Sequence, residues 1–265
     1  MKPYYEHAGI TIYHADCRDI LPHLEPVDLV LTDPPYSSGG MFRGDRAAKP
    51  LAKYVQTGSM FTCQDDFSGD NMDQRSFLKW ASLWLTDALR ISRDGAAICL
   101  FSDWRQLPLM SDALQGGGWV WRNIVTWWKP GIRMQRGRFS SSSEYILYGS
   151  KGIPNPGEKS PQNVLRFSPV SGDDKVHIAE KPTELLICLL GISPAGSVVL
   201  DPFMGSGTTL VAAQQLGRRA IGIEIESKYC DIAIHRLQQQ SLCLQDTISH
   251  DTVRKKEQGE LYHGT

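Results

Sequence analysis

Short apolar runs that end in a polar or acidic residue recur along the chain and predict β-strands. The predicted strands are residues 11–16, 27–33, 96–101, 197–201 and 219–224. Apolar residues three and four positions apart predict helices between and after them. The predicted helices are residues 74–90, 180–190, 208–216 and 228–242. Strands that alternate with helices are typical of an α/β fold with a largely parallel sheet.

Residues 119–129 and 143–151 have strand-like patterns with no helical pattern between them, so we expect an antiparallel pair at an edge of the sheet. Three stretches have no sustained period. Residues 37–68 predict a mobile loop, residues 151–176 a short irregular insert, and residues 246–265 a flexible polar tail. We expect one domain over residues 1–245.

The composition is that of an ordinary globular protein: 265 residues, 41% hydrophobic and 22% charged. No apolar run reaches the roughly 18 residues of a membrane span, and the first residues do not resemble a signal peptide, so we expect a cytoplasmic protein. The six cysteines are scattered without metal-ligand spacing, which predicts reduced thiols and no metal site. The net charge of −1 hides a local excess, because residues 113–143 contain five basic side chains and no acidic one.

The most informative feature is a pair of strand ends. One apolar strand ends in Asp33, Pro34, Pro35 and Tyr36, and another ends in Asp201, Pro202 and Phe203. The carboxyl ends of parallel strands lie at one edge of a sheet, and ligands bind there where the strand order reverses. Both Asp-Pro corners can therefore line one crevice.

The second corner continues into a glycine turn and a helix start: Gly205, Ser206, Gly207, Thr208 and Thr209. Glycines allow close backbone approach to a ligand, and the free N–H groups of a helix start favour an anionic or polar group. The phosphate-loop and dinucleotide patterns are absent. Glu224 ends the next strand, where an acidic residue can accept hydrogen bonds from ribose hydroxyls. The pattern predicts a nucleoside-type site, with a purely structural turn as the alternative.

The first corner contains several hydrogen-bond acceptors close together. The two prolines fix the backbone and remove two N–H donors, which leaves the carbonyl groups of Asp33 and Pro34 beside the Asp33 carboxylate. Such a cluster suits a substrate donor such as an exocyclic amino group, and Tyr36 offers a flat face for a ring. The alternative is a surface turn with a helix-capping Asp33.

Together these residues resemble the amino-group DNA methyltransferases that use S-adenosylmethionine (SAM), in the β order of their motifs and over roughly residues 10–240. The resemblance implies a doubly wound, mostly parallel, seven-stranded-type sheet with an antiparallel edge, the Rossmann-like methyltransferase fold. It implies that Asp33, Pro34, Pro35 and Tyr36 are catalytic. It further implies a cofactor site that combines the second corner (Asp201, Pro202 and Phe203), the glycine turn and Glu224 with Asp16, Cys17, His177, Lys181, Pro182 and Thr183.

The chemistry that the resemblance implies is methyl transfer to an amino group of a flipped base in duplex DNA. An Asp at the start of the catalytic motif favours adenine N6, with cytosine N4 as the alternative. A small-molecule enzyme with a dinucleotide cofactor is a competing hypothesis, and a non-catalytic DNA-binding protein is another. Neither hypothesis explains both corners.

Basic and polar side chains in two loops are the candidates for DNA contacts. They are Arg43, Arg46, Lys49, Lys53, Arg133, Gln135, Arg136 and Arg138. The insert at residues 151–176 is short for a recognition element, which implies a short or relaxed target sequence. The sequence leaves open a homodimer, and also whether the role is in restriction–modification, phage protection or regulation in a bacterium or phage.

Overall fold

The computed structural model describes residues 2–35, 72–132, 136–137, 139–170 and 181–240. In this part of the chain, nine strands form one mixed sheet in the order β1-β2-β9-β8-β3-β4-β6-β5-β7. The strands are β1 (Tyr5–His7), β2 (Ile10–His14), β3 (Val27–Thr32), β4 (Ser92–Ser102), β5 (Val120–Trp128), β6 (Ser143–Ser150), β7 (Val164–Arg166), β8 (Val198–Asp201) and β9 (Arg219–Glu224).

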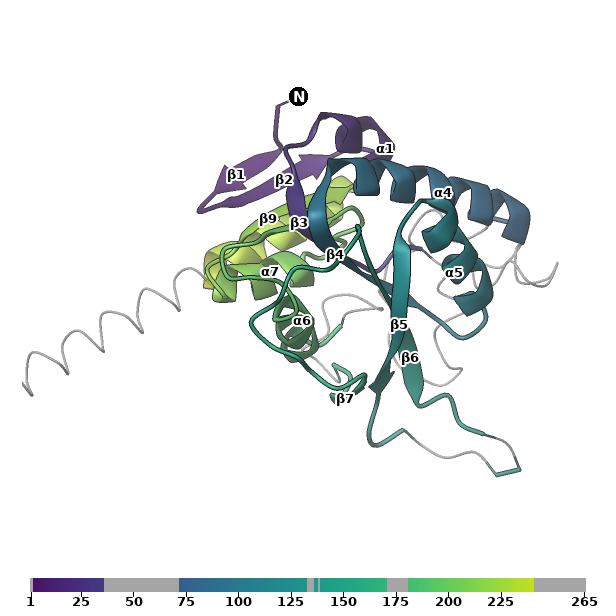
Figure 1. Ribbon diagram of the computed structural model, residues 1–265. Coiled ribbons are helices and arrows are strands. Elements are labelled where there is room, and N and C mark those ends of the chain that lie inside the picture. The colour runs from purple at the N-terminus through teal and green to yellow at the C-terminus, as the bar shows by residue number, and fades with distance from the viewer. Residues whose placement is uncertain (1, 36–71, 133–135, 138, 171–180, 241–265) are drawn as a thin grey trace, which may run out of the picture.

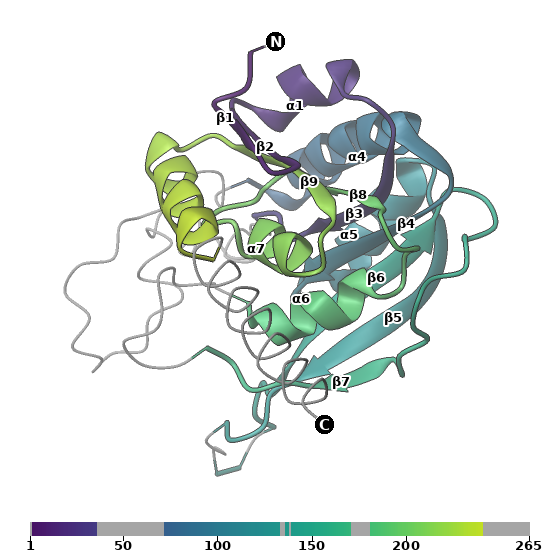
Figure 2. The ribbon, with the colours of Figure 1, turned by 90° about the vertical axis from the view of Figure 1, so that its left-hand side faces the viewer.

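Helices cover both faces of this sheet (Figures 1 and 2). One face carries α1 (Cys17–Ile20), a 3-10 turn (Leu21–His23), α4 (Gln74–Ile91) and α5 (Leu107–Gly116). The other face carries α6 (Thr183–Leu190), α7 (Thr208–Gln215) and a helix that includes residues 227–240. The sheet therefore separates two hydrophobic cores, as in a doubly wound fold.

The helical spacing in the sequence has the expected structural cause. In α4, Phe77, Ala81, Trp84, Leu85 and Ala88 are all fully buried. These positions recur every three or four residues, so they form one apolar stripe against the sheet. Asp73 caps the helix by accepting hydrogen bonds from the N–H groups of the first turn.

The connections create a switch point between β8 and β3. The chain passes from β3 to its parallel neighbour β4 on one side, and from β8 to its parallel neighbour β9 on the other. β3 and β8 are themselves parallel, with Val30 opposite Leu200. The two predicted Asp-Pro corners consequently follow adjacent strands at the same edge.

The predicted strands and helices are confirmed, with two corrections at the sheet margins. β5 and β6 pair antiparallel as expected, but β7 adds a parallel strand outside β5, so this pair does not form the edge. β1 forms the other, antiparallel edge and brings the described strands to nine rather than seven. Both added strands are only three residues long, too short to show a period in the sequence. The predicted loop at 37–68 and tail at 246–265 lie outside the described residues.

Candidate active site

Asp201 joins the ends of β8 and β3. Its Oδ1 accepts hydrogen bonds from the Thr32 hydroxyl at 2.6 Å and from the Phe203 backbone N–H at 3.1 Å. Burial raises the pKa of Asp201 to about 6, although hydrogen bonds from Thr32 and Thr209 act in the opposite direction. This carboxyl group organises the strand end and the turn that follows it.

The glycine turn after β8 depends on two left-handed residues. Gly205 has φ +49° and Gly207 has φ +79°, a region that favours glycine. A Cβ atom on Gly207 would lie 2.6 Å from the Cβ of Ala233 in the helix at 227–240, whereas one on Gly205 would meet no atom within 4 Å. Gly207 thus permits close helix packing, and Gly205 leaves open space in which a ligand can approach the backbone.

Arg236, which the sequence patterns did not single out, supports this turn from behind. Its Nη1 lies 2.9 Å from the Ser206 carbonyl oxygen and 3.0 Å from the hydroxyl oxygens of Ser206 and Thr208. The hydroxyl groups of Ser206 and Thr208, two residues predicted to bind the cofactor, therefore accept hydrogen bonds from a helix that packs behind the turn. A lone arginine in an amphipathic helix gives no sequence signal for this role.

Glu224 and Asp16 lie at the ends of neighbouring strands. The Glu224 carboxylate accepts hydrogen bonds from the Gly205 N–H at 3.0 Å and the Glu226 N–H at 2.8 Å, and burial raises its pKa. The Ala15 N–H donates to the Glu224 carbonyl oxygen at 3.0 Å, which brings Asp16 alongside. Asp16 caps α1 and pairs with Arg18 at 2.6 Å, and these hydrogen bonds lower its pKa.

Two further predicted cofactor residues face inward. Burial raises the pKa of the Cys17 thiol to about 12, so this side chain stays a neutral thiol. The Phe203 ring lies 5.5 Å from the ring of Trp80 and 5.1 Å from that of Trp84, centroid to centroid. α4 thereby fixes the position of the ring in the second corner.

Asp33 directly follows β3 in the first corner. Its Oδ2 forms an ion pair with the Lys181 ammonium group, while its Oδ1 is buried without a hydrogen-bond partner among the described residues. Burial raises the pKa of Asp33 to about 6, with Lys181 opposing the shift and the charges of Glu144 and Asp201 adding to it. Pro34 and Pro35 contribute no N–H donors here.

Some of the remaining predicted site residues lie within the described ranges, and the others lie outside them. Pro182 is the N-cap of α6 and Thr183 is its first residue, which sets Lys181 at the helix entrance. Arg136 is exposed in the connection between β5 and β6. Outside the described residues lie Tyr36, His177, Arg43, Arg46, Lys49, Lys53, Arg133, Gln135 and Arg138.

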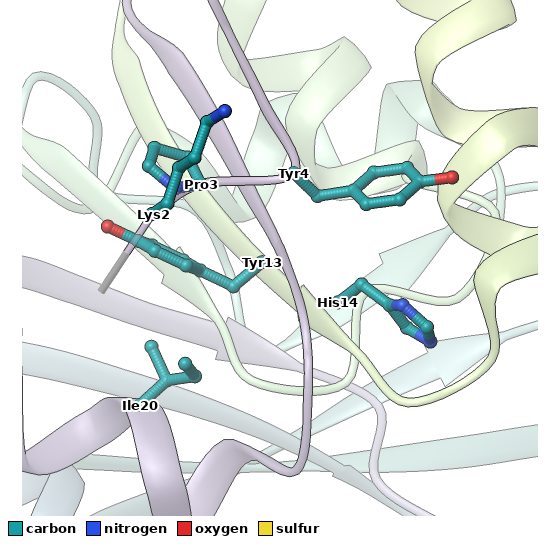
Figure 3. A pocket seen from close by; sticks show the side chains of 6 residues that line it. All are labelled: Lys2, Pro3, Tyr4, Tyr13, His14 and Ile20. Carbon is teal, nitrogen blue, oxygen red and sulfur yellow. The ribbon is translucent and has the colours of Figure 1, made fainter.

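A separate pocket of about 330 Å³ lies at the β1–β2 margin. Figure 3 shows Tyr13 and Ile20 on one side of it, with Tyr4 turned away toward the helix at 227–240. The Tyr4 hydroxyl donates to Asp231 at 2.8 Å, and its ring contacts His14 edge-on. β9 and β8 separate β2 from β3, so this pocket is distinct from the Asp33 corner.

The described part of the chain contains neither a metal-binding cluster nor a membrane-spanning helix. It holds no group of three or more His, Cys, Asp or Glu side chains arranged to bind a metal ion. None of its helices combines the length and apolar character needed to cross a membrane.

The fold and the two corners define a class: a Rossmann-like SAM-dependent methyltransferase. The space over Gly205 is open, and the Gly205 N–H donates to the Glu224 carboxylate beside it. The model of the N6/N4 methyltransferase family, described as DNA methylase, matches residues 27–235. The chain therefore belongs to this family of DNA amino-methyltransferases.

Individual relatives agree with this assignment. The chain is 30% identical to the Type II methyltransferase M.HinfI of Haemophilus influenzae, over 86% of this chain and 68% of that protein. It is 26% identical to the Type II methyltransferase M2.MboI of Moraxella bovis, over 89% and 91%. The solved M1.HpyAVI–SAM complex superposes with a TM-score of 0.62 at 26% identity, over 86% and 98% of the two chains.

A further solved structure shares the fold. The PvuII DNA methyltransferase, which is cytosine-N4-specific, superposes with a TM-score of 0.67 at 16% identity, over 89% of this chain and 88% of that one. At this identity the likeness concerns the fold alone.

Proposed function

We propose that this protein transfers the methyl group of SAM to the N6 amino group of adenine in DNA, after the base has left the duplex stack. The observation that carries the proposal is Asp33 Oδ1, a buried acceptor that makes no hydrogen bond to a described residue beside a donor-free Pro-Pro segment. An exocyclic amino group supplies the donors that such a site requires.

The proposed chemistry needs positioning and electrostatics. Asp33 Oδ1 and the Pro34 carbonyl oxygen each accept a hydrogen bond from one of the two N–H groups of the amino group. These hydrogen bonds favour a tetrahedral nitrogen, whose lone pair is then free to form the new N–C bond. SAM supplies, when bound, a methyl group on a positively charged sulfur that leaves as a neutral thioether. The methylated nitrogen then loses one proton to water.

For the cofactor, we propose that the turn at Gly205 and the acidic groups of Glu224 and Asp16 hold SAM at the ends of β8, β9 and β2. The backbone of the turn is held by Arg236, so it is preorganised. Phe203 supplies an apolar wall that is braced by Trp80 and Trp84. This arrangement supports the cofactor residues predicted from the resemblance.

For DNA, we propose that the substrate approaches the carboxyl edge beside β4, β5 and β7. Two tryptophans there each lie against an arginine: Trp104 (56% exposed) with Arg105 at 5.3 Å, and Trp128 (40% exposed) with Arg166 at 5.1 Å. Aromatic faces stack on bases, and arginines neutralise phosphates. Trp104 follows β4, which is the immediate neighbour of β3, the strand that precedes Asp33.

The test separates adenine from cytosine, since the fold serves both bases. The protein is incubated with labelled SAM and unmethylated duplex DNA, and the DNA is digested to nucleosides. We expect the label in N6-methyldeoxyadenosine; label in N4-methyldeoxycytidine would support the alternative. Asp33→Ala is expected to bind SAM without transfer. SAM binding by the wild type with no transfer to DNA would contradict the proposal.

A further inference from the structure

Four charged side chains of alternating sign form a row that ends at Asp33. The Lys181 ammonium group contacts Asp33 on one side and lies 3.4 Å from Glu144 Oε2 on the other. Glu144 Oε1 in turn forms an ion pair with Lys129. The row is therefore Asp33, Lys181, Glu144 and Lys129, two carboxylates and two ammonium groups with no net charge.

The fold brings these residues together from four separate segments. Glu144 lies in β6 opposite Trp127 of β5, so Lys129 comes directly after the partner strand. The Lys129 N–H donates to the Ser142 carbonyl oxygen at 2.8 Å, which holds the two strand ends together. β4 separates β6 from β3, and Lys181 spans that distance from the entrance of α6.

The middle of the row is shielded from water. The Lys181 side chain is only 9% exposed and lies 5.2 Å from the centre of the Phe101 ring. Burial disfavours its charged form, yet Asp33 and Glu144 outweigh this effect and raise its pKa. Glu144 likewise has a lowered pKa despite burial, because Lys181 and Lys129 face it. Each charge is thus maintained by its neighbours, and removing one leaves another buried and unpaired.

The row leaves the two oxygens of Asp33 unequal. Oδ2 is bound to Lys181, and Oδ1 is buried without a hydrogen bond to any described residue. A carboxylate held by one oxygen cannot rotate to exchange its two oxygens without breaking the ion pair. Oδ1 therefore keeps one orientation.

We propose that Lys181 and Glu144 are positioning residues, which hold Asp33 with Oδ2 on the lysine and Oδ1 available to the substrate amino group. Neither would touch the reacting atoms. The role of Oδ1 rests on the proposed function, whereas the hold on Asp33 is a property of the protein itself. Lys181 would then serve the catalytic carboxylate rather than the cofactor site in which the resemblance placed it.

The two positioning residues act on Asp33 in opposite directions, which separates this role from a structural one. The charged groups that face Asp33 are Lys181 near α6, Glu144 in β6 and Asp201 in β8. Loss of the lysine charge removes an attraction, so the Asp33 pKa should rise. Loss of the Glu144 charge removes a repulsion, so the Asp33 pKa should fall. A variant that only loosens the fold would not give shifts of opposite sign.

The experiment uses Lys181→Gln, Glu144→Gln and the conservative Lys181→Arg in the full-length protein. The Asp33 carboxyl is titrated by carbon-13 NMR, and methyl transfer to DNA is measured against pH. We expect Lys181→Gln to raise the Asp33 pKa by about 1–3 units, Glu144→Gln to lower it by less, and Lys181→Arg to restore it. At neutral pH, Lys181→Gln should reduce kcat about 100-fold with an unchanged KM for SAM.

Glu158→Gln is the matched control. Glu158 also forms an ion pair with a buried cation, Arg218. That cation directly precedes β9, so it lies at the amino end of this parallel strand, whereas Asp33 lies at the carboxyl end of β3. The control should leave the Asp33 titration and kcat unchanged. The positioning role would be overturned if neither Lys181→Gln nor Glu144→Gln shifted the Asp33 pKa. It would also be overturned if Lys181→Gln raised the KM for SAM and left kcat unchanged. Absence of methyl transfer by the wild type would instead overturn the proposed function, because the NMR arm needs no substrate.

Discussion

Both oxygens of an Asp side chain are pure acceptors only while the carboxyl group is ionised, and the pKa of Asp33 lies close to neutral pH. Burial and the negative charges of Glu144 and Asp201 favour its protonated form, while Lys181 favours the carboxylate. The balance raises the Asp33 pKa to about 6. At neutral pH the group is therefore ionised, and moderate acid converts one of its acceptors into a donor.

This balance predicts an acidic limb in the pH profile. Methyl transfer should be constant above pH 7 and fall about tenfold for each pH unit well below the Asp33 pKa of about 6. The measurement is kcat from pH 5 to 8, with SAM binding followed over the same range. A profile that stays flat down to pH 5, as an ordinary Asp with a pKa near 4 would give, would contradict the role assigned to this environment.

The residues that could be predicted from sequence are those in local motifs. Asp33 and Asp201 stand in short patterns after apolar strands, and their proximity followed from the parallel sheet. The contacts of Glu144, Lys181 and Arg236 could not be predicted, because each joins segments far apart in the chain. Glu144 gave a weak signal only, as an acidic residue at the start of an apolar strand after a long basic stretch.

At the scale of elements, the β8–turn–α7 unit contains two glycines with different tasks. Gly207→Ala should lower the free energy of unfolding by more than the roughly 1–2 kcal/mol of the left-handed backbone, because its Cβ would also collide with Ala233. Gly205→Ala should lower the free energy of unfolding only by the cost of the left-handed backbone. It should also weaken SAM binding, because its Cβ would enter open space in the proposed site.

Urea unfolding and SAM calorimetry on both variants separate these effects. Gly217→Ala provides a control, since Gly217 directly follows the C-cap of α7 with φ +62° and no atom within 4 Å of an added Cβ. It should lose stability as Gly205→Ala does, but keep the SAM affinity of the wild type. Equal SAM affinity in the Gly205 and Gly217 variants would argue against a cofactor site at the turn.

β5 offers a matched pair of tryptophans. Trp121 is 38% exposed near its amino end and Trp128 is 40% exposed at its carboxyl end. Trp128→Ala should weaken DNA binding on the order of tenfold, since base stacking contributes about 1–3 kcal/mol per base. Trp121→Ala, roughly 23 Å away along the strand, should leave it unchanged. Equal losses in a fluorescence-anisotropy titration would exclude the carboxyl edge as the DNA-facing side.

The elements predicted best were those with a full period of their own. α4 could be recognised because its buried positions repeat over 18 residues, and β3 because four of its six residues are apolar and an Asp-Pro corner follows. β7 gave no such signal, since only Leu165 of its three residues is buried and a proline-rich segment precedes it. Its pairing with β5 depends on tertiary contacts that no local pattern encodes.

At the scale of the whole molecule, the net charge of −1 conceals a division along one edge of the sheet. Glu224, Asp201 and Asp33 follow or end β9, β8 and β3. Arg105 and Lys129, after β4 and β5, are paired with Asp103 and Glu144, whereas Arg166 at the end of β7 forms no ion pair with a described residue. The acidic strand ends coincide with the proposed cofactor site, and Arg166 lies at the proposed DNA approach. A near-neutral protein can thus bind a polyanion through a local field.

This division predicts that DNA affinity and SAM affinity respond differently to salt. Each phosphate contact releases condensed counterions, so the logarithm of DNA affinity should fall linearly with the logarithm of salt concentration. Arg166→Ala should reduce that slope by about 1, the contribution of one phosphate contact, without changing SAM affinity. Arg219→Ala is the control, because Arg219 is exposed at the opposite, amino end of β9. If both variants keep the wild-type slope, Arg166 does not face the phosphates and DNA must approach another part of the edge.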